Sequence, residues 1–532
     1  MSNTFKPFID RQIWISSTPS PTQWQPGYAP SSDMRNNKYA NPFIYQYLGA
    51  LSYRYSTLQK AWQPYTSPGL SGSNTTGATS VFAPSFSNVG TIAAGATTTS
   101  VTLSTALAQA VGLNTLANHG NSGFILRIID TTAGKTVERE IVANTASTTP
   151  VITVASSFGF VPATGSRYEI LAGRVFYLNS GTVVAGIYKS VDIAANIASG
   201  NLATLNLPGT ISTDSSMIAL DEQYVPYNCV PGEGMVKGSY EYTTGINALS
   251  ATATSTNTLT GQATGGDAVV AANEYRNFQI RIVEDTTTPA AVGQRRIISS
   301  NTAGASPVYT LTTNWTTTPS SSAKFVIELP NLILLRTSAT TSIYVYNYTD
   351  ATLTNAAAGT IASGSWSTTY FAAATNNHLV NSFWMPSWGI QPDVARLSRQ
   401  SFCYFFRGSG SNQLDLFDIA GGTTGAWTNG ISYDGAIAIT AGSCGTNSPF
   451  GFEGRYGYLT VHSALAINTL YRFDLKNRIL TPASAPDDIQ GTAGGAGQRF
   501  ATYAARDGSD LYDIVFFHSN NSTKTQELIP LV

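Results

Sequence analysis

The chain has 532 residues, of which 11% are charged and 11% are aromatic, and its formal net charge is −1. This balance lacks the excess of Lys and Arg that neutralises a phosphate backbone, so nucleic-acid binding is not expected as the main activity. Intrinsic disorder is excluded as well, because disordered chains are poor in aromatic residues and rich in charge. With 47 Gly, 24 Pro and many Thr and Tyr residues, the composition favours an all-β protein of several domains with short strands and many turns.

The first residues and the cysteines indicate where the chain is made. Residues 1–21 lack a basic segment followed by an apolar one, so we expect no secretory signal. No apolar run reaches the length of about 18 residues that a membrane span needs. Cys229, Cys403 and Cys444 are widely spaced and odd in number, which argues against a disulfide framework. We therefore expect a chain made in a reducing cytoplasm, with cysteines that are small buried residues rather than nucleophiles.

The first predicted element of the scaffold lies in residues 44–65, "IYQYLGALSYRYSTLQKAWQPY". It reads as an apolar strand, a small polar turn and a second strand that closes near Tyr55. We assign residues 1–87 to the first part of this scaffold.

Residues 88–171 form a different unit, which contains the Thr-rich phrase "FILRIIDTTAGKTVEREIVANTASTTPVITV" from Phe124 to Val154. Alternation of apolar and polar residues predicts about five short strands, hence a small β-barrel or β-sandwich. The scaffold pattern returns at 174–197, where the equivalent strand closes at Asp192, and we assign 172–244 to it.

Residues 245–329 repeat the unit of 88–171. Arg281 matches Arg127, and Glu284 matches Asp130. The register slips by three residues, from an offset of 154 to one of 157, and we place this slip in the turn, where insertions are tolerated best. The sequence therefore predicts two copies of one β domain.

The remainder, 330–532, carries further copies of the scaffold pattern. They are found at 331–353, 401–427, 456–480 and, as a partial copy, 511–532. Tyr346, Asp418 and Asp474 close the strands equivalent to those that close at Tyr55 and Asp192. A spacing of about 50 residues is typical of propeller blades, so we predict a β-propeller of roughly six blades.

Both inserted units are expected between the first and second strands of a blade, because each ends just before an apolar scaffold strand. Such an exposed position leaves the pairing of the blade intact. The last copy lacks a strand, and the N-terminal segment "DRQIWIS" (10–16) is predicted to supply it and close the ring.

No residues are assigned to catalysis, to a metal or to a cofactor. His119, His378, His462 and His518 stand far apart, and no metalloprotease, Cys-x-x-Cys, calcium-loop or phosphate-loop motif is present. We interpret each histidine as a surface or strand residue rather than a ligand. Four Asn-x-Ser/Thr sequences, at Asn74, Asn314, Asn347 and Asn521, carry little meaning without an export signal.

Some propellers are enzymes, and two features invite that comparison. Arg407, Arg455 and Arg472 on scaffold strands would suit either a sialidase-like arginine cluster or cross-strand ion pairs. "YDG" at 433–435 and "RDG" at 506–508 resemble Asp-box turns, but Asp-Gly is also a common hairpin turn, which is the interpretation we favour. A glycosidase carboxylate pair is invisible in a sequence, because it forms only in space.

The inserted units carry matched charged residues: Arg127 and Glu138-Arg139 in the first, Arg281 and Arg295-Arg296 in the second. One interpretation is cross-strand charge pairs on a solvated sheet face. The other is a surface that docks a partner or contacts a glycan.

The order of motifs in both units, hydrophobic-Arg-Ile, a Gly-containing turn, Asn-Thr and a Val/Thr strand, resembles a module of tailed-bacteriophage structural proteins. The first copy ends in Tyr-Glu-Ile, whereas the second has Val-Ile-Glu at this point. The remaining chain resembles propeller-bearing virion proteins of short-tailed phages, most of all the tail nozzle. The resemblance implies a structural, non-enzymatic protein of the virion tail, made in the host cytoplasm. It implies a hexameric ring that contacts the adaptor and fibres and lets DNA pass through its channel.

Two other classes remain open. One is a receptor-binding or capsid-decorating protein that binds glycans through the inserted units. The other is a propeller enzyme that acts on surface polysaccharide.

Overall fold

The computed structural model describes residues 88–104, 125–145, 147–171, 248–262, 270–337, 340–348, 366–376, 402–408, 410–433 and 477–482, together with the strands named below outside these ranges. These residues form an all-β protein, as predicted. The described part contains no α-helix and one short 3-10 turn, η3 (Pro289–Ala291).

Six strands of the second inserted unit form a closed barrel, here called barrel 2. Around the ring the order is β22-β23-β20-β19-β24-β21, and β21 pairs again with β22. All neighbouring strands are antiparallel. The strands are β19 (Leu249–Thr254), β20 (Thr258–Gly261), β21 (Gln279–Glu284), β22 (Arg295–Asn301), β23 (Val308–Leu311) and β24 (Lys324–Glu328).

The first inserted unit, here called barrel 1, has the same strand order. β7 pairs β12, which pairs β9; β9 pairs β10, which pairs β11; and β11 pairs β8. A bridge between Ile92 and Leu103 joins β8 back to the end of β7 and closes the ring. The described residues of each unit thus form six strands, where about five were expected, and these strands form a barrel rather than a sandwich. The strands are β7 (Asn88–Thr91), β8 (Ser100–Thr102), β9 (Ile125–Asp130), β10 (Lys135–Asn144), β11 (Val151–Val154) and β12 (Arg167–Leu171).

Strand β9 is buried at every position, on both of its faces. Ile129 belongs to an apolar cluster made mostly of barrel 2 residues, and Ile125 belongs to another cluster that includes Phe176 of a neighbouring sheet. Because alternate residues of a strand point to opposite faces, Leu126 and Ile128 face the other way, into barrel 1. The nearly continuous apolar run "ILRII" is therefore explained by a strand that is covered on both sides.

The described scaffold strands form six small antiparallel sheets, five with four described strands and one with three. Their orders are β2-β3-β4-β5, β6-β13-β14-β15, β16-β25-β26, β27-β30-β31-β32, β33-β34-β35-β36 and β37-β38-β39-β1. The bounds of the first three sheets are β2 (Pro26–Tyr28), β3 (Phe43–Leu48), β4 (Leu51–Ser56), β5 (Ala61–Tyr65), β6 (Thr79–Ala83), β13 (Arg174–Asn179), β14 (Ile187–Asp192), β15 (Ile197–Ala198), β16 (Ser215–Leu220), β25 (Leu332–Thr337) and β26 (Tyr344–Asn347). Those of the other three are β27 (Phe383–Ser387), β30 (Phe402–Phe406), β31 (Gln413–Asp418), β32 (Ala426–Ser432), β33 (Cys444–Asn447), β34 (Tyr456–Val461), β35 (Thr469–Asp474), β36 (Ile479–Pro482), β37 (Arg499–Asp507), β38 (Asp510–His518), β39 (Lys524–Pro530) and β1 (Phe8–Trp14). Two hairpins, β17 (Cys229–Val230) with β18 (Gly234–Met235) and β28 (Gln391–Asp393) with β29 (Arg396–Ser398), complete the described strands.

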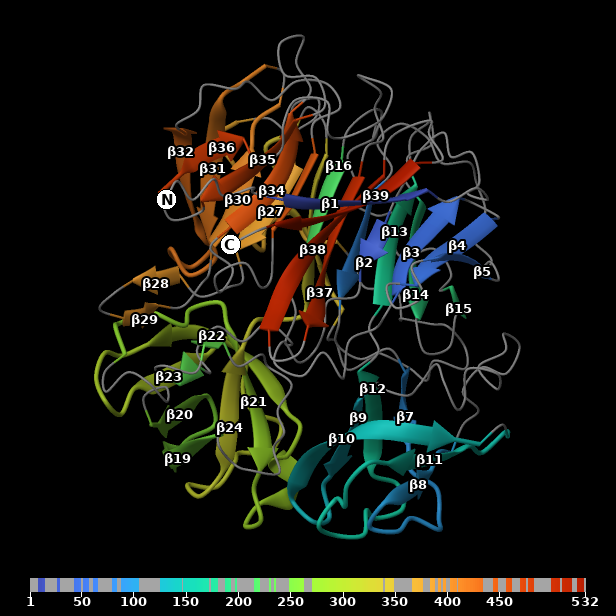
Figure 1. The fold of residues 1–532 in the computed structure, drawn as a ribbon. Coiled ribbons are helices and arrows are strands. Elements are labelled where there is room, and N and C mark those ends of the chain that lie inside the picture. Colours follow the sequence, from blue (N-terminus) through green and yellow to red (C-terminus); the bar gives the residue numbers. More distant parts are fainter. Residues whose placement is uncertain are drawn as a thin grey trace, which may run out of the picture.

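The two barrels enter the scaffold at equivalent places. Strand β6 pairs with β13, and all six strands of barrel 1 lie between them in the sequence. Likewise β16 pairs with β25, and barrel 2 lies between them. In both cases the first and second strands of a sheet stay paired across the insertion. In Figure 1 the barrels lie side by side on one side of the small sheets.

The residues predicted to close equivalent strands do so. Each lies at or next to the end of the third strand of its sheet: Tyr55 in β4, Asp192 in β14, Tyr346 in β26, Asp418 in β31 and Asp474 in β35. Two of them fix the turn that follows. Asp418 accepts a bond from the backbone N–H of Ala420, and Asp474 from that of Asn477. Aspartate recurs here because its short side chain caps a turn two or three residues on.

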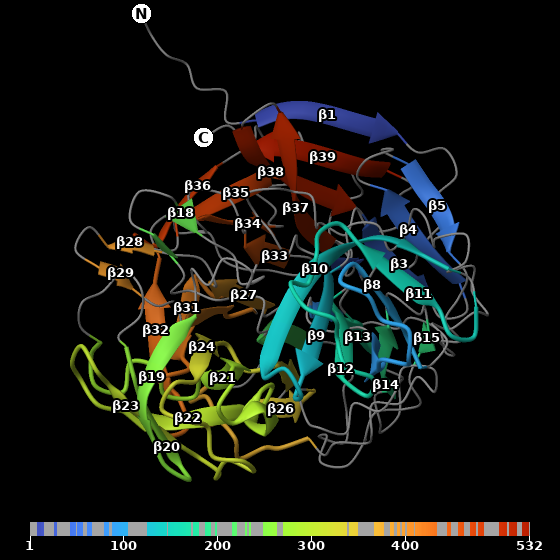
Figure 2. The same cartoon turned by 90° about the horizontal axis from the view of Figure 1, so that it is seen from below.

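The predicted pairing of the two chain ends is confirmed. Strand β1 pairs with β39 along seven residues, from Phe8 opposite Pro530 to Trp14 opposite Lys524, and Figure 2 shows them side by side. Arg506 and Asp507 of the "RDG" segment end β37, and Asp507 is opposite Asp510 at the start of β38, as the hairpin interpretation expects; Gly508 lies outside the described residues.

Removal of residues 1–14 tests the role of this pairing. Without β1, strand β39 becomes an open sheet edge, which favours self-association. We expect the Tm to fall by about 4 °C or more and the fraction of large oligomers to rise. Differential scanning fluorimetry and light scattering provide the readouts. Removal of residues 1–7 alone, which precede β1, is the matched control and should leave both unchanged; equal Tm values for the two truncations would contradict the prediction.

Candidate functional site: the junction of the two barrels

The two barrels share one continuous sheet. Lys135 at the start of β10 is opposite Glu284 at the end of β21, and the backbone N–H of Asp285 donates to the carbonyl oxygen of Gly134 at 2.9 Å. The turn of barrel 1 therefore pairs with the end of the corresponding strand in barrel 2.

Two glycines allow this close approach. Gly134 has φ of +67°, and a Cβ there would lie 2.3 Å from the carbonyl oxygen of Asp285. Gly293 has φ of +83°, and its Cβ would lie 2.6 Å from Cγ2 of Ile129 in barrel 1. Because the first of these contacts is with backbone, it cannot be relieved by a change of rotamer. The glycines in the two equivalent turns thus set the distance between the barrels.

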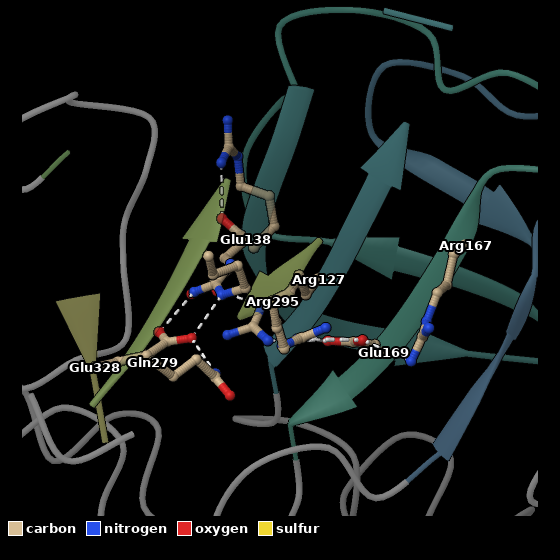
Figure 3. Close-up of polar contacts among 9 residues, drawn as sticks. Arg127, Glu138, Arg167, Glu169, Gln279, Arg295 and Glu328 are labelled. Carbon is tan, nitrogen blue, oxygen red and sulfur yellow. Dashed lines mark hydrogen bonds and ion pairs between the residues drawn. The ribbon is translucent and has the colours of Figure 1, made fainter. Parts of the chain in front are cut away.

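A buried carboxylate, Glu169 on β12, binds three arginines (Figure 3). Its oxygens lie 2.9 Å from Nη1 of Arg127, 3.0 Å from Nη2 of Arg167 and 3.1 Å from Nη2 of Arg295. Arg127 also donates to Glu138 at 2.6 Å, directly across the strand pair β9–β10. Arg127 and Glu169 are fully buried, and Arg295 comes from barrel 2. This cluster is therefore an ionic contact between the barrels.

The equivalent strand pair of barrel 2 has a different charge pattern. Arg295 stands where barrel 1 has Glu138, so Arg281 is opposite a second arginine instead of a glutamate. Like charges opposite each other destabilise a strand pair unless each finds an anion. Arg281 finds Glu328 on β24, at 2.9 Å and 3.2 Å, and Arg295 finds Glu169 of barrel 1. The positive charge of Arg295, which replaces the negative charge of Glu138, is thus balanced by Glu169 of the other barrel.

The position of the partner carboxylate also differs between the copies. In barrel 1, Glu169 is directly opposite Arg127, whereas in barrel 2 the residue opposite Arg281 is Val326. Glu328 lies two residues further on the same face and also accepts a bond from Gln279 at 2.8 Å. The substitution of Tyr-Glu-Ile by Val-Ile-Glu, noted in the sequence, therefore keeps an Arg–Glu pair with a shifted glutamate.

The prediction that the matched charged residues lie on a solvated sheet face is wrong for most of them. The residues are cross-strand partners as expected, but Arg127, Glu138, Arg139 and Arg281 are at most 5% exposed. Arg295 and Arg296 are half-buried. In a single sequence, a buried charge that pairs with a neighbouring strand is indistinguishable from a charge that faces water.

The turns also correct the residue matching. Asp130 accepts bonds from the backbone N–H groups of Thr132 and Ala133. Asp285, not Glu284, makes the equivalent bonds, to Thr287 and Thr288. The pairing of β21 with β24 contains a bulge between Ile282 and Glu284. One of the three inserted residues therefore lies in the strand rather than in the turn, since a bulge accommodates an extra residue.

A cleft of about 550 Å³ opens at the junction. One wall is Arg167 of barrel 1, another is formed by barrel 2, and Asn347 of β26 lies at its border. Arg296 in this wall donates to the carbonyl oxygens of Asn314 and Arg295 and to the hydroxyl of Thr316. The described lining consists of Arg167, Gln279, Gly293, Gln294, Arg295, Arg296, Ile297, Thr312, Thr313, Thr316 and Asn347. Such a polar, cationic lining is suited to an anionic ligand that also carries hydroxyl groups.

Outside the junction, Arg407 forms an ion pair with the buried Asp415 across the β30–β31 hairpin, as the structural interpretation expects. Arg472 lies on β35 opposite Tyr458, and Arg455 lies outside the described residues. Cys403 is buried, and burial raises the pKa of its thiol well above its usual value, which disfavours the thiolate that a nucleophile needs.

The remaining predicted positions are described only in part. His518 ends β38, and Cys229 and Cys444 begin β17 and β33, but nothing is described of their side chains. Tyr433 of "YDG" is buried; Asp434 and Gly435 lie outside the described residues. The same holds for His119, His378, His462, Asn74 and Asn521. Within the described part of the chain, His, Cys, Asp and Glu side chains form no group of three or more that would hold a metal ion. Nor does this part include a helix with the length and apolarity of a membrane span.

The sequence analysis did not single out one buried cation, Arg336. Arg336 on β25 is fully buried and stacks on Phe405 at 4.0 Å and Trp427 at 5.4 Å. Burial lowers its pKa to about 10, and the charge of Asp415 opposes this shift. It joins the β16-β25-β26 sheet to the β27-β30-β31-β32 sheet by cation–π contact, which no local motif signals.

No family model matches this chain, and neither does any curated protein. Among similar solved structures is a Penicillium chrysogenum α-L-arabinanase complexed with arabinobiose, with 11% identity over 67% of this chain and 90% of that chain and a TM-score of 0.24. The major Malassezia sympodialis allergen Mala s 1 has 9% identity over 66% and 89%, with a TM-score of 0.22. NanB with Optactamide has 7% identity over 96% and 94%, with a TM-score of 0.20. Likeness at this level carries no argument about activity.

Substitution of Gly134 tests the close approach of the barrels. Gly134→Ala introduces both left-handed strain and a clash with Asp285, whereas Gly159→Ala introduces the strain alone, because nothing lies within 4 Å of a Cβ at Gly159. We expect a loss of unfolding free energy of about 1 kcal/mol for Gly159→Ala and at least about 2 kcal/mol more for Gly134→Ala. Urea denaturation measures both. Equal losses would mean that the junction tolerates a side chain.

Glu169→Gln tests the ionic contact. The change leaves three arginines around a neutral amide in a buried site, and we expect a loss of about 3–5 kcal/mol. Glu284→Gln is the control: its partner Lys324 is 3.6 Å away and 39% exposed, so the loss should stay below about 1 kcal/mol. If Glu169→Gln costs no more than Glu284→Gln, the cluster does not stabilise the junction.

Proposed function

We propose that this chain is a structural component of a tailed-bacteriophage virion, most specifically the tail nozzle. In this proposal the six small sheets are the blades of a six-bladed β-propeller. The barrels are rigid attachments on one side of it.

The observation that carries the architecture is a cycle of contacts between the first strands of the sheets. Strand β2 contacts β6, β6 contacts β16, and β16 contacts β27; β27 contacts β33, β33 contacts β37, and β37 contacts β2. A cycle of sheets that each touch the next through their first strand is what radial repetition of blades produces. The pairing of β1 with β39 supports ring closure by the two chain ends.

A structural role is supported by how the duplicated units are fixed. They continue one sheet, approach through glycine and share a buried carboxylate, so barrel 1 cannot turn relative to barrel 2 without breaking these contacts. Rigid units of this kind are suited to filling space between subunits or holding fibres, rather than to closing over a substrate.

The weak net charge is consistent with a channel for DNA. A formal charge of −1 gives the protein little bulk attraction for a phosphate backbone. A channel wall must let DNA slide, and strong counterion-releasing contacts would hold it back. The phage assignment itself rests on the resemblance of the duplicated phrase to phage structural modules, and the expected partners are five further copies, the adaptor and the fibres.

Two measurements test the proposal. Quantitative mass spectrometry of purified particles of the source phage should find this chain at six copies for each tail, and mass photometry should find a ring of six either for the chain alone or after the adaptor is added. Absence from purified particles would overturn the virion role. A chain that is present in the particle, but at another copy number and monomeric even with the adaptor, would overturn the nozzle while keeping a virion role.

A further inference from the structure

The cleft between the barrels has the chemistry of a ligand site that the nozzle proposal does not use. We propose that it binds a carboxylate-bearing saccharide, with the carboxylate held by Arg167, Arg295 and Arg296 and the sugar hydroxyls held by the threonine wall.

The charge of the cleft favours an anion. In the buried cluster, three guanidinium groups (Arg127, Arg167 and Arg295) share two carboxylates, those of Glu138 and Glu169. The described ion pairs of this cluster thus join more guanidinium groups than carboxylates, and Arg296 adds a further positive charge at the cleft wall. Guanidinium groups bind carboxylates in a planar, two-bonded geometry, which a half-buried site strengthens.

The arginines are held in place before any ligand arrives. Glu169 is fully buried and forms ion pairs with Arg167 and Arg295. Arg296 donates to the carbonyl oxygen of Asn314 and to the hydroxyl of Thr316. Arg167 keeps 35% of its side chain exposed, so it still reaches solvent and a ligand. Pre-ordered side chains lower the entropy cost of binding.

The rest of the lining is suited to hydroxyl groups. Thr312, Thr313 and Thr316 are exposed along one wall, and Asn347 faces the cleft from the neighbouring sheet. No aromatic side chain is among the described lining residues, so the apolar face of a neutral sugar has nothing to stack on. Recognition would therefore depend on the anionic group, with the hydroxyl contacts fixing orientation.

The size of the cleft accommodates a short segment of a saccharide. A cleft of about 550 Å³ is within the range of roughly 300–1,000 Å³ that small-molecule sites occupy. The threonine wall is open, so a longer chain can continue beyond it. An acidic surface polysaccharide that offers one uronic acid unit at a time fits this shape.

Isothermal titration calorimetry of the full chain tests the proposal, with trigalacturonic acid as the probe and a neutral galactose trisaccharide as the matched ligand. We expect binding of the acidic trisaccharide, at least tenfold weaker or undetectable binding of the neutral one, and an affinity that falls as NaCl is raised. Arg167→Gln should reduce the affinity at least tenfold. Arg478→Gln removes an exposed arginine of the β35–β36 turn and should change nothing.

A second variant covers the case in which Arg167→Gln does not fold. Thr313→Glu places a negative charge on an exposed position of the cleft wall, so it should fold normally and abolish binding. Equal binding of both trisaccharides, no binding of the acidic one, or an equal effect of Arg478→Gln would overturn the proposal. Sulfate that binds as tightly as the acidic trisaccharide would reduce the site to a general anion site and overturn the saccharide assignment. Single-stranded DNA that binds more tightly and loses affinity in Thr313→Glu would assign the cleft to nucleic acid instead.

Discussion

The structure of the duplicated units depends on one buried carboxylate. An ionised glutamate that is fully buried is costly unless it is paired and hydrogen-bonded. Glu169 takes its partners from two strands of barrel 1 and from β22 of barrel 2. Arg295 in turn is opposite another arginine within its own barrel. Arg295 of barrel 2 therefore depends on a carboxylate of barrel 1, whereas Glu169 also pairs with Arg127 and Arg167 of its own barrel.

This dependence changes the meaning of the duplication. Two identical domains would each carry the Arg–Glu pair seen between Arg127 and Glu138, and neither would need the other. The replacement of that glutamate by Arg295, and the shift of the strand glutamate to Glu328, make the copies complementary rather than equivalent. The glycine turns then bring the backbones close enough for the charges to meet. The differences between the copies thus lie at their interface, and Arg295 also lines the cleft beside it.

The sequence predicted the features that appear as repeats or as alternation of apolar and polar residues. The two inserted units, their place between paired strands, the closing positions such as Asp418 and the pairing of the N-terminal segment all follow from local patterns of strand and turn. It did not predict that the units dock on each other, because Arg295 and Glu169 are 126 residues apart and no local pattern signals a contact between two separate units. The sequence placed all three inserted residues of the second unit in the turn, whereas one of them lies in the bulge of β21. A bulge has no marker in the sequence comparable to Gly or Pro in a turn.

The cleft was not predicted because the arginines near it were interpreted as residues of a solvated sheet face. Charged residues on alternate positions of a strand usually indicate a solvated face, and for Arg127 and Arg281 that inference fails because both side chains are buried and paired with carboxylates. At the edge of the covered face, Arg167, Arg295 and Arg296 are only partly enclosed. A cation at such a boundary is desolvated enough to interact strongly and exposed enough to be reached. The docking of the barrels thus accounts both for the burial of one set of arginines and for the accessibility of the other.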